Sequence, residues 1–256
     1  MEERHSMATE AQKLLAEYRR GKAALDARVV ENDQWYRLRH WQRMRPSGNP
    51  GDPEPASAWL LNCLLNKHAD AMDNYPEPVV LPREEGDRAD ATVLSAVLPV
   101  ILEQNGFEQT YSDMWWQKLK SGAGILGVFW NPSKQGGQGD VDVRRVDILN
   151  LFWEPGVTDI QDSRNVFHVE LRDNEDLLAR YPQLEGKLGQ GADRPQVYVY
   201  DDAIDTSKKS AMVDWYYKRD GLLHYAKIVN GEVLYASQED PACAGRGFYD
   251  HGQYPF

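Results

Sequence analysis

The last third of the chain has the most regular alternation of hydrophobic and polar positions. Three β-rich runs, 212–219, 222–229 and 232–237, are joined by the dipeptides Asp220-Gly221 and Asn230-Gly231. Both dipeptides favour type I′ turns, in which the two central residues take positive φ. The pattern therefore predicts a three-stranded antiparallel meander with aromatic cross-strand pairs. The residues expected to form those pairs are Trp215, Tyr217, Leu223, Tyr225, Val233 and Tyr235.

Helical periodicity dominates the start of the chain. Apolar residues recur at helical spacing over 8–45, which predicts one or two helices with Gly21 as a weak point. Proline and glycine make 45–55 a loop. The next apolar pattern predicts a helix over 57–74 with Ser57 as its N-cap.

The segment that follows this helix is rich in proline. It continues as Val79-Val80-Leu81-Pro82, which we expect to be an extended edge segment. A further helix is predicted over 90–104, although Pro99 should kink or split it. Another helix is predicted over 108–121, with Ser112 or Asp113 as its N-cap.

The sequence Gly122-Ala123-Gly124-Ile125-Leu126-Gly127 has the letters of a dinucleotide-binding fingerprint. That fingerprint requires a strand before the glycines and a helix after them, because the helix N-terminus holds the pyrophosphate. Here the order is helix and then strand. We therefore interpret Gly122 as the residue of positive φ that ends the helix, and Gly124 as the point of reversal.

From this point the pattern is mainly that of β-strands. Strands are predicted over 125–130, 140–146 and 164–172. A short helix is predicted over 174–180, with Asp173 as its cap. Together with the meander, these elements predict an α+β fold in which N-terminal helices pack on a mainly antiparallel β region.

Composition is ordinary for a globular protein, with 41% hydrophobic and 27% charged residues in a chain of 256. No apolar run is long enough to predict a membrane span, and no secretory signal is recognisable at the N-terminus. Cys63 and Cys243 are best interpreted as free thiols in a reducing cytoplasm. The net charge of −11 argues against a surface that grips nucleic acid throughout, but it leaves room for a local basic patch.

A basic stretch interleaved with aromatic residues is the strongest candidate for a contact surface. Such a stretch can bind nucleic acid, but a solvated helix face with aromatics packed inward is the more common arrangement. We take it as a candidate subunit or DNA contact. Its residues are Trp35, Arg37, Arg39, Trp41, Arg43 and Arg45.

The search for catalytic chemistry yields only weak groupings. His68, Asp70 and Asp73 do not share one helix face, so they make a poor metal site. His168 and Glu170 point the same way on a predicted strand, which we expect to be an exposed face. Acidic residues around a Pro-Gly turn could hold a hard cation, but turn caps and an Asp162–Arg164 contact explain them better. These acidic residues are Glu154, Asp159 and Asp162. We therefore predict no catalytic, cofactor or metal site.

Taken in order, several motifs of the chain resemble the portal (head-to-tail connector) proteins of tailed bacteriophages, in their podovirus-like branch. The motifs extend from the aromatic "QW" element at Gln34-Trp35 to the end of the meander. Between them lie the helix 57–74 with its proline-rich exit, the Gly-rich passage from helix to strand at 119–130, and a turn at 153–164. Glu154 stands where the family usually has Asp. The full set is Asn32 to Tyr36, 57–82, Leu119 to Trp130, Val146 to Asn150, Trp153 to Gly156 with Asp162 to Arg164, and the meander through Phe256.

The resemblance implies a structural subunit of a ring, commonly of twelve copies, at one vertex of the capsid. DNA would enter through the ring during packaging, driven by the terminase, and leave through it at infection. Implied partners are further copies of the chain, the terminase large subunit, capsid or scaffold proteins, head-to-tail adaptor proteins and double-stranded DNA. The family implies no catalytic residues, no cofactor and no membrane. Assembly would take place in the bacterial cytoplasm.

The same resemblance suggests how the chain is organised. We expect an N-terminal helical segment over 1–50, a helical part of the portal wing over 51–124 and a β-rich part of the wing over 125–256. The stem and clip of a portal would then follow in a longer chain. We expect rings from that longer chain, with the 256-residue piece alone monomeric or only loosely associated.

Two other classes of function remain open at this point. One is an α+β enzyme that handles nucleotides or sugars with the acidic residues of 154–162 or with His168. The other is a β-rich binding module that uses the aromatic meander as its recognition face.

Overall fold

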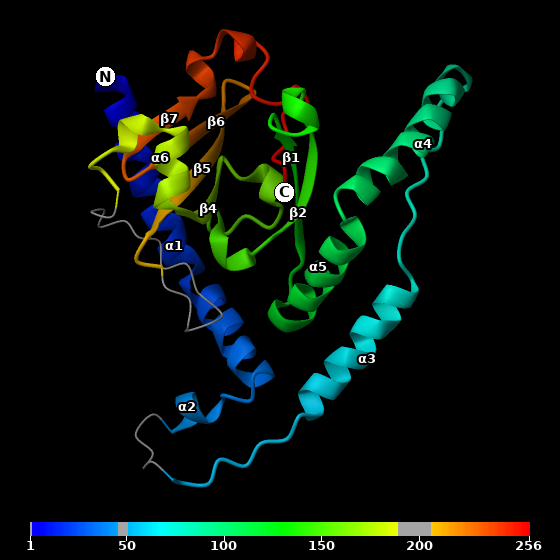
Figure 1. Ribbon diagram of the computed structural model, residues 1–256, viewed down its shortest axis with the longest axis vertical. Helices are drawn as coiled ribbons and strands as arrows, with labels where there is room; N and C mark the ends of the chain where they lie inside the picture. The colour runs from blue at the N-terminus through cyan, green and yellow to red at the C-terminus, as the bar shows by residue number, and fades with distance from the viewer. Residues whose placement is uncertain (1, 46–50, 189–205) are drawn as a thin grey trace. The chain divides into compact units, whose positions relative to one another are not determined.

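The computed structural model describes residues 2–45, 51–188 and 206–256 (Figure 1). Its internal contacts divide the chain into two compact units. We call residues 1–26 with 149–254 the sheet unit, and residues 27–148 with 255–256 the helical unit. The three segments expected from the resemblance concern portal regions rather than units of packing, and they remain a proposal.

The sheet unit is built on five antiparallel strands in sequence order. These are β3 (Leu151–Trp153), β4 (Asn165–Asp173), β5 (Lys209–Arg219), β6 (Leu222–Val229) and β7 (Glu232–Ala236). The predicted meander is confirmed as β5 to β7. All four turn residues between these strands have positive φ, between 48° and 79°, as type I′ turns require.

One face of this sheet packs against the first half of α1 (Glu2–Tyr36), which runs behind the strands in Figure 1. Ala8, Ala11 and Tyr18 are buried there at helical spacing. They meet Phe167 on β4 and Trp215 on β5, whose rings lie 5.8 Å apart. This interface is the hydrophobic core of the sheet unit.

The opposite face of the sheet is covered by α6 (Asn174–Arg180) and the short 3₁₀ helix that follows it. Leu177 and Leu184 pack there against Met212 and Val229. The predicted bounds of α6 are confirmed. Asp173 occupies the N-cap position, but its side chain makes no capping hydrogen bond and instead lies 3.4 Å from the ammonium of Lys209.

Gly21 is not a break in the N-terminal helix, contrary to the prediction. α1 continues through it without interruption. A Cβ at this position would lie 2.4 Å from Cγ of Pro155, so glycine is needed for the close approach of the turn after β3. The region 8–45, predicted as one or two helices, contains α1, which ends at Tyr36, and the single-turn helix α2 (Trp41–Met44).

The helical unit contains the second half of α1, the helix α2, three longer helices and a β-hairpin. The longer helices are α3 (Trp59–Asp73), α4 (Arg88–Gln104) and α5 (Phe107–Ser121), and the hairpin pairs β1 (Ile125–Asn131) with β2 (Asp140–Val146). α5 contacts α3, α4 and both hairpin strands. In the part of the chain that the structure describes, no helix is long and apolar enough to cross a membrane.

The ends of these helices correct several sequence predictions. α3 begins after Ala58, and Ser57 is not its cap. α5 begins after Gly106, whose φ is 58°, rather than at Ser112 or Asp113. α4 is one continuous helix that includes Pro99, so the predicted split does not occur.

The glycines between α5 and β1 behave as predicted. Gly122 has φ of 86°, and its amide donates to the carbonyl of Lys118, which ends α5. A Cβ on Gly124 would lie 2.3 Å from the sulfur of Met114, so this glycine allows the chain to turn back against its own helix. The fingerprint letters are therefore a helix stop and a close approach, on the wrong side of a helix for a dinucleotide.

Candidate interaction surface

Large apolar side chains are exposed in one part of the described structure. Among the described residues, all large hydrophobic side chains classed as exposed belong to the helical unit, between residues 35 and 130. The most exposed are Leu81 (78%), Trp59 (76%) and Val79 (71%). Contiguous apolar patches on a soluble protein usually mark an interaction site. The others are Trp35, Leu38, Met44, Leu60, Leu65, Tyr75, Val93, Leu94, Val97, Val100, Val128 and Trp130.

The stretch that carries most of these residues has almost no core of its own. Of the described residues between 51 and 100, only Leu64 and Ala91 are buried. Burial of apolar surface stabilises by about 25 cal/mol per Å². Two helices that leave so many apolar side chains in water therefore gain little stability from their own unit. A partner that covered them would supply it.

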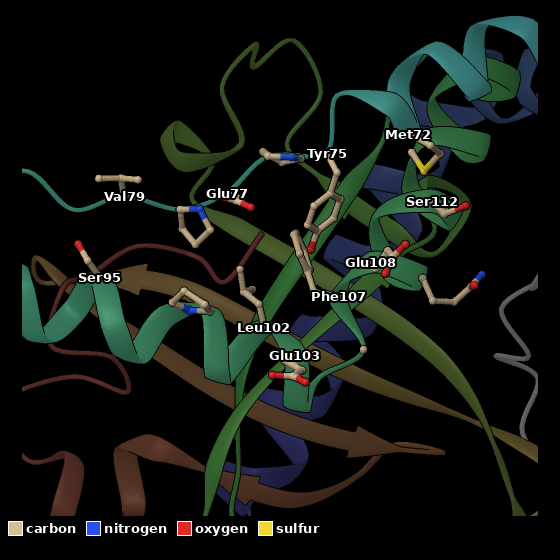
Figure 2. Close-up of a pocket in the computed structure, with 15 residues that line it drawn as sticks. Met72, Tyr75, Glu77, Val79, Ser95, Leu102, Glu103, Phe107, Glu108 and Ser112 are labelled. Carbon is tan, nitrogen blue, oxygen red and sulfur yellow. The ribbon is translucent and has the colours of Figure 1, made fainter.

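A groove of about 1050 Å³ lies among α3, α4, α5 and the linker between α3 and α4. Figure 2 shows Ser95 and Leu102 of α4 on one side and Phe107 and Glu108 of α5 on another. Three carboxylates line the groove, and no cation does among the described lining residues. We call this feature the acidic groove; its three carboxylates are Glu77, Glu103 and Glu108.

An aromatic cluster forms one wall of the acidic groove. Tyr75 at the end of α3 makes an edge contact of 5.4 Å with Tyr111 and lies 6.2 Å from Phe107, between ring centroids. Burial, with the neighbouring Glu108 charge, raises the pKa of Tyr75, so its hydroxyl stays neutral across the physiological range. The wall thus offers apolar rings beside carboxylates, a combination that suits a cationic side chain on an apolar stem.

The linker and α3 are held in place by specific polar contacts. The hydroxyl of Ser95 on α4 accepts from the amide of Val80 at 3.0 Å and lies 3.2 Å from its carbonyl. The segment 79–82 is therefore anchored beside α4, although it forms no strand. His68 lies 3.0 Å from the Ser112 hydroxyl and stacks on Trp116 at 4.3 Å, which fixes α3 against α5.

The basic-aromatic segment predicted as a contact site (35–45) is partly committed to its own neighbours. Trp35 stacks on His40 with centroids 4.3 Å apart, and it is 42% exposed. The guanidinium of Arg45 lies 4.3 Å above the ring of Trp41, whose indole nitrogen donates to the carbonyl of Pro55 at 2.9 Å.

The arginines of this segment do not act alike. Arg37 donates to the buried carboxylate of Asp33 at 2.8 Å, so its charge is matched within the chain. Arg39 and Arg45 are exposed. Arg43 belongs to α2, but its side chain lies outside the described residues. Among the described side chains of this segment, Arg39 and Arg45 are the arginines that lie at the surface.

His168 and Glu170 do not lie on an exposed strand face, as the sequence predicted. His168 is buried on β4. Its Nδ1 lies 3.9 Å from the buried carboxylate of Asp214, and its Nε2 lies 3.7 Å from the half-buried carboxylate of Glu170. Tyr225 donates to Asp214 at 2.5 Å, and the ammonium of Lys227 lies 3.3 Å away. Burial alone would raise the pKa of Asp214, but the neighbouring His168, the Lys227 charge and the Tyr225 hydrogen bond together hold this pKa below its ordinary value.

The acidic turn at 154–162, for which the sequence favoured turn caps over a bound cation, makes contacts of its own. Arg164 pairs with both carboxylate oxygens of Glu154, rather than with Asp162 as expected, and this hydrogen bond lowers the pKa of Glu154. Asp159 accepts from the amide of Gln161 at 2.9 Å as the cap of a short 3₁₀ helix. Nowhere in the described chain do three or more His, Cys, Asp or Glu residues gather as a metal site would require.

The aromatic residues of the meander are packed inside rather than displayed. Trp215 and Tyr217 are 1% exposed, and burial raises the pKa of Tyr217 to about 12. Aromatic cross-strand contacts do form. One of them joins Tyr225 to Tyr216, which was not among the residues predicted to pair, with ring centroids 4.9 Å apart. A recognition face on this sheet would need these rings at the surface, so the binding-module alternative loses its site.

Sequence reasoning missed the acidic groove, because its walls come from three helices and a linker whose packing no local pattern gives. One signal was available. α4 is apolar on most of its circumference, and such a helix is normally buried. Its exposed valines and leucine are Val93, Leu94, Val97 and Val100.

No curated protein matches the chain. A family model described as phage P22-like portal protein matches residues 69–246, which is more than two thirds of the chain and includes most of the acidic groove and the meander. The chain therefore belongs to the phage P22-like portal protein family.

Proposed function

We propose that this protein is a subunit of the ring through which phage DNA is packaged into the capsid and later ejected. Its membership of the portal family gives it a structural role in the virion. The observation that carries the finer proposal is that, among the described residues, the exposed large apolar side chains all belong to the helical unit. A ring subunit needs such surfaces, since each copy must cover part of its neighbour.

The remaining partners follow from the same role. The ring would sit at one capsid vertex, contact capsid or scaffold proteins, and dock the terminase large subunit and a head-to-tail adaptor. It would be assembled in the cytoplasm of the bacterial host. The net charge of −11 suits a ring past which DNA must slide without being held.

The role in packaging can be tested in the phage itself. Disruption of the gene, complemented by the intact gene on a plasmid, is the basic comparison. We expect heads without packaged DNA when the gene is disrupted, and full heads when it is supplied in trans. DNA-filled, infectious particles in the absence of the gene product would overturn the proposal.

The enzyme alternative makes a separate prediction. An enzyme that used the acidic turn would bind a nucleotide, a sugar or a divalent cation and melt at a higher temperature in its presence. Because Glu154 and Asp159 are already engaged by Arg164 and the Gln161 amide, we expect no shift across such a panel. A shift that Glu154→Gln removes would revive that alternative.

A further inference from the structure

We infer that the acidic groove of one copy receives the basic-aromatic segment 35–45 of a second copy. This inference rests on the proposed ring, and it names the two surfaces that would meet. The groove is formed by α3, α4, α5 and the linker between α3 and α4. The segment comprises the end of α1, the residues between α1 and α2, and α2 with Arg45.

Charge complementarity is the first argument for this pairing. The segment 35–45 contains no acidic residue; of its four arginines, Arg37 is matched by Asp33, whereas Arg39 and Arg45 are exposed. The groove presents Glu77, Glu103 and Glu108, all exposed, and no cation among its described lining residues. Opposite potentials on two surfaces favour their encounter and fix their register.

The apolar character of the two surfaces is the second argument. Three apolar side chains of the segment are exposed: Met44 (58%), Trp35 (42%) and Leu38 (37%). On the groove side, Val79 is exposed on the linker and the Tyr75 ring forms part of the wall. Arginine and aromatic side chains are the residues that most often anchor such interfaces, through stacking on rings and through ion pairs at the rim.

The geometry of rings gives the third argument. A closed ring needs a heterologous interface, in which one patch of a subunit meets a different patch of the next. The segment and the groove are two such different patches on the same chain. The segment does not line its own groove, whose volume of about 1050 Å³ is open to an incoming chain.

Cross-linking between two differently tagged copies tests the contact directly. Both copies, expressed from the complete gene, carry Cys63→Ser and Cys243→Ser, since Cys63 is exposed and would react. One copy then carries Met44→Cys and the other Val79→Cys. After co-assembly and treatment with a short bismaleimide, we expect a cross-linked pair that contains both tags. A matched pair with Thr158→Cys in place of Val79→Cys, an exposed site in the sheet unit, should give at least tenfold less.

Charge reversal adds a readout that does not depend on cysteine chemistry. Arg39→Glu with Arg45→Glu in one copy should reduce the cross-link at least tenfold, and Glu103→Arg with Glu108→Arg in the partner copy should restore it. Glu3→Arg with Glu185→Arg, two exposed positions of the sheet unit, is the control for net charge and should leave the cross-link unchanged.

The possible outcomes distinguish a failure of the proposed pairing from a failure of the proposed ring. Rings that sediment normally but give no heterologous cross-link, or whose cross-link ignores the charge reversals, would overturn the pairing and leave the ring intact. A wild-type protein that stays monomeric would overturn the ring and the pairing together.

Discussion

At the scale of single residues, a structural constraint could be predicted where its cause is local, but not where the contacting residue is distant in the chain. Gly122 was identifiable because a helical pattern stops and a strand begins around it, and its φ of 86° agrees. Gly21 is also required to be glycine, but for a different reason. Its cause is the close approach of Pro155, which lies 134 positions later in the chain and is not part of any local pattern. His168 was misplaced for the same cause, because Asp214 and Tyr225 come from other strands.

Gly21→Ala should destabilise the protein, although alanine is the better helix former by about 1 kcal/mol. The added Cβ would lie 2.4 Å from Cγ of Pro155, and such overpacking typically costs about 1–3 kcal/mol. Urea denaturation measures the change. In a Pro155→Gly background, which removes both the Cγ and the Cβ that the new methyl group would meet, the same substitution should be neutral or stabilising. A stabilising effect in the wild-type background would show that the turn after β3 does not lie against α1.

Asp214→Asn should lower the free energy of unfolding at pH 7 by about 3–5 kcal/mol, since it leaves the Lys227 charge without its buried partner. The folded pKa of Asp214 is below its ordinary value of 3.8, so the stabilisation is complete above that value and is lost as pH falls toward the folded pKa. The difference between wild type and variant should therefore shrink below about pH 4. Denaturation curves between pH 7 and pH 3 measure it, and a constant difference would contradict the arrangement.

At the scale of elements, the sequence was most informative where structure is local. The bounds of α6 and β2 were predicted correctly, and the meander followed from two dipeptides, because type I′ turns need only adjacent residues of positive φ. Helix starts were less predictable. The N-cap position of α5 is Gly106, six residues before Ser112, the nearer of the two predicted caps, and the Ser112 hydroxyl instead lies 3.0 Å from His68.

The end of α5 gives a test of the Gly122 interpretation. Nothing lies within 4 Å of a Cβ at this residue, so the cost of substitution is that of the backbone alone. Gly122→Val should lower stability by about 1–2 kcal/mol, whereas Gly122→Asn should cost less because asparagine tolerates positive φ. Thermal denaturation compares the two. Equal melting temperatures for wild type and Gly122→Val would contradict the helix-stop assignment.

At the scale of the whole molecule, the contrast between the two units is the main finding. The sheet unit buries both faces of its sheet, against α1 and against α6. The helical unit leaves its apolar residues on α3, α4 and their linker in water. The sequence identified the apolar residues but not their exposure. Periodicity predicts which face of a helix is apolar, but not whether that face is buried by the same chain or by another.

Polar replacements on this surface should separate folding from assembly. Leu81→Asn and Val93→Thr change side chains that are 78% and 60% exposed, so the free energy of unfolding of the monomer should change by no more than about 0.5 kcal/mol. Ring assembly should require at least about tenfold more protein, since burial of each side chain contributes about 1.5–3 kcal/mol to the contact. Sedimentation velocity measures this, with Thr158→Asn as control. Unchanged assembly would place the subunit contact elsewhere.

Negative-stain electron microscopy of the protein expressed from its complete gene shows whether the subunits form a ring. We expect closed rings of uniform subunit number, with density around a central opening. A preparation that remains strictly monomeric at high concentration, with the fold intact by circular dichroism, would contradict it.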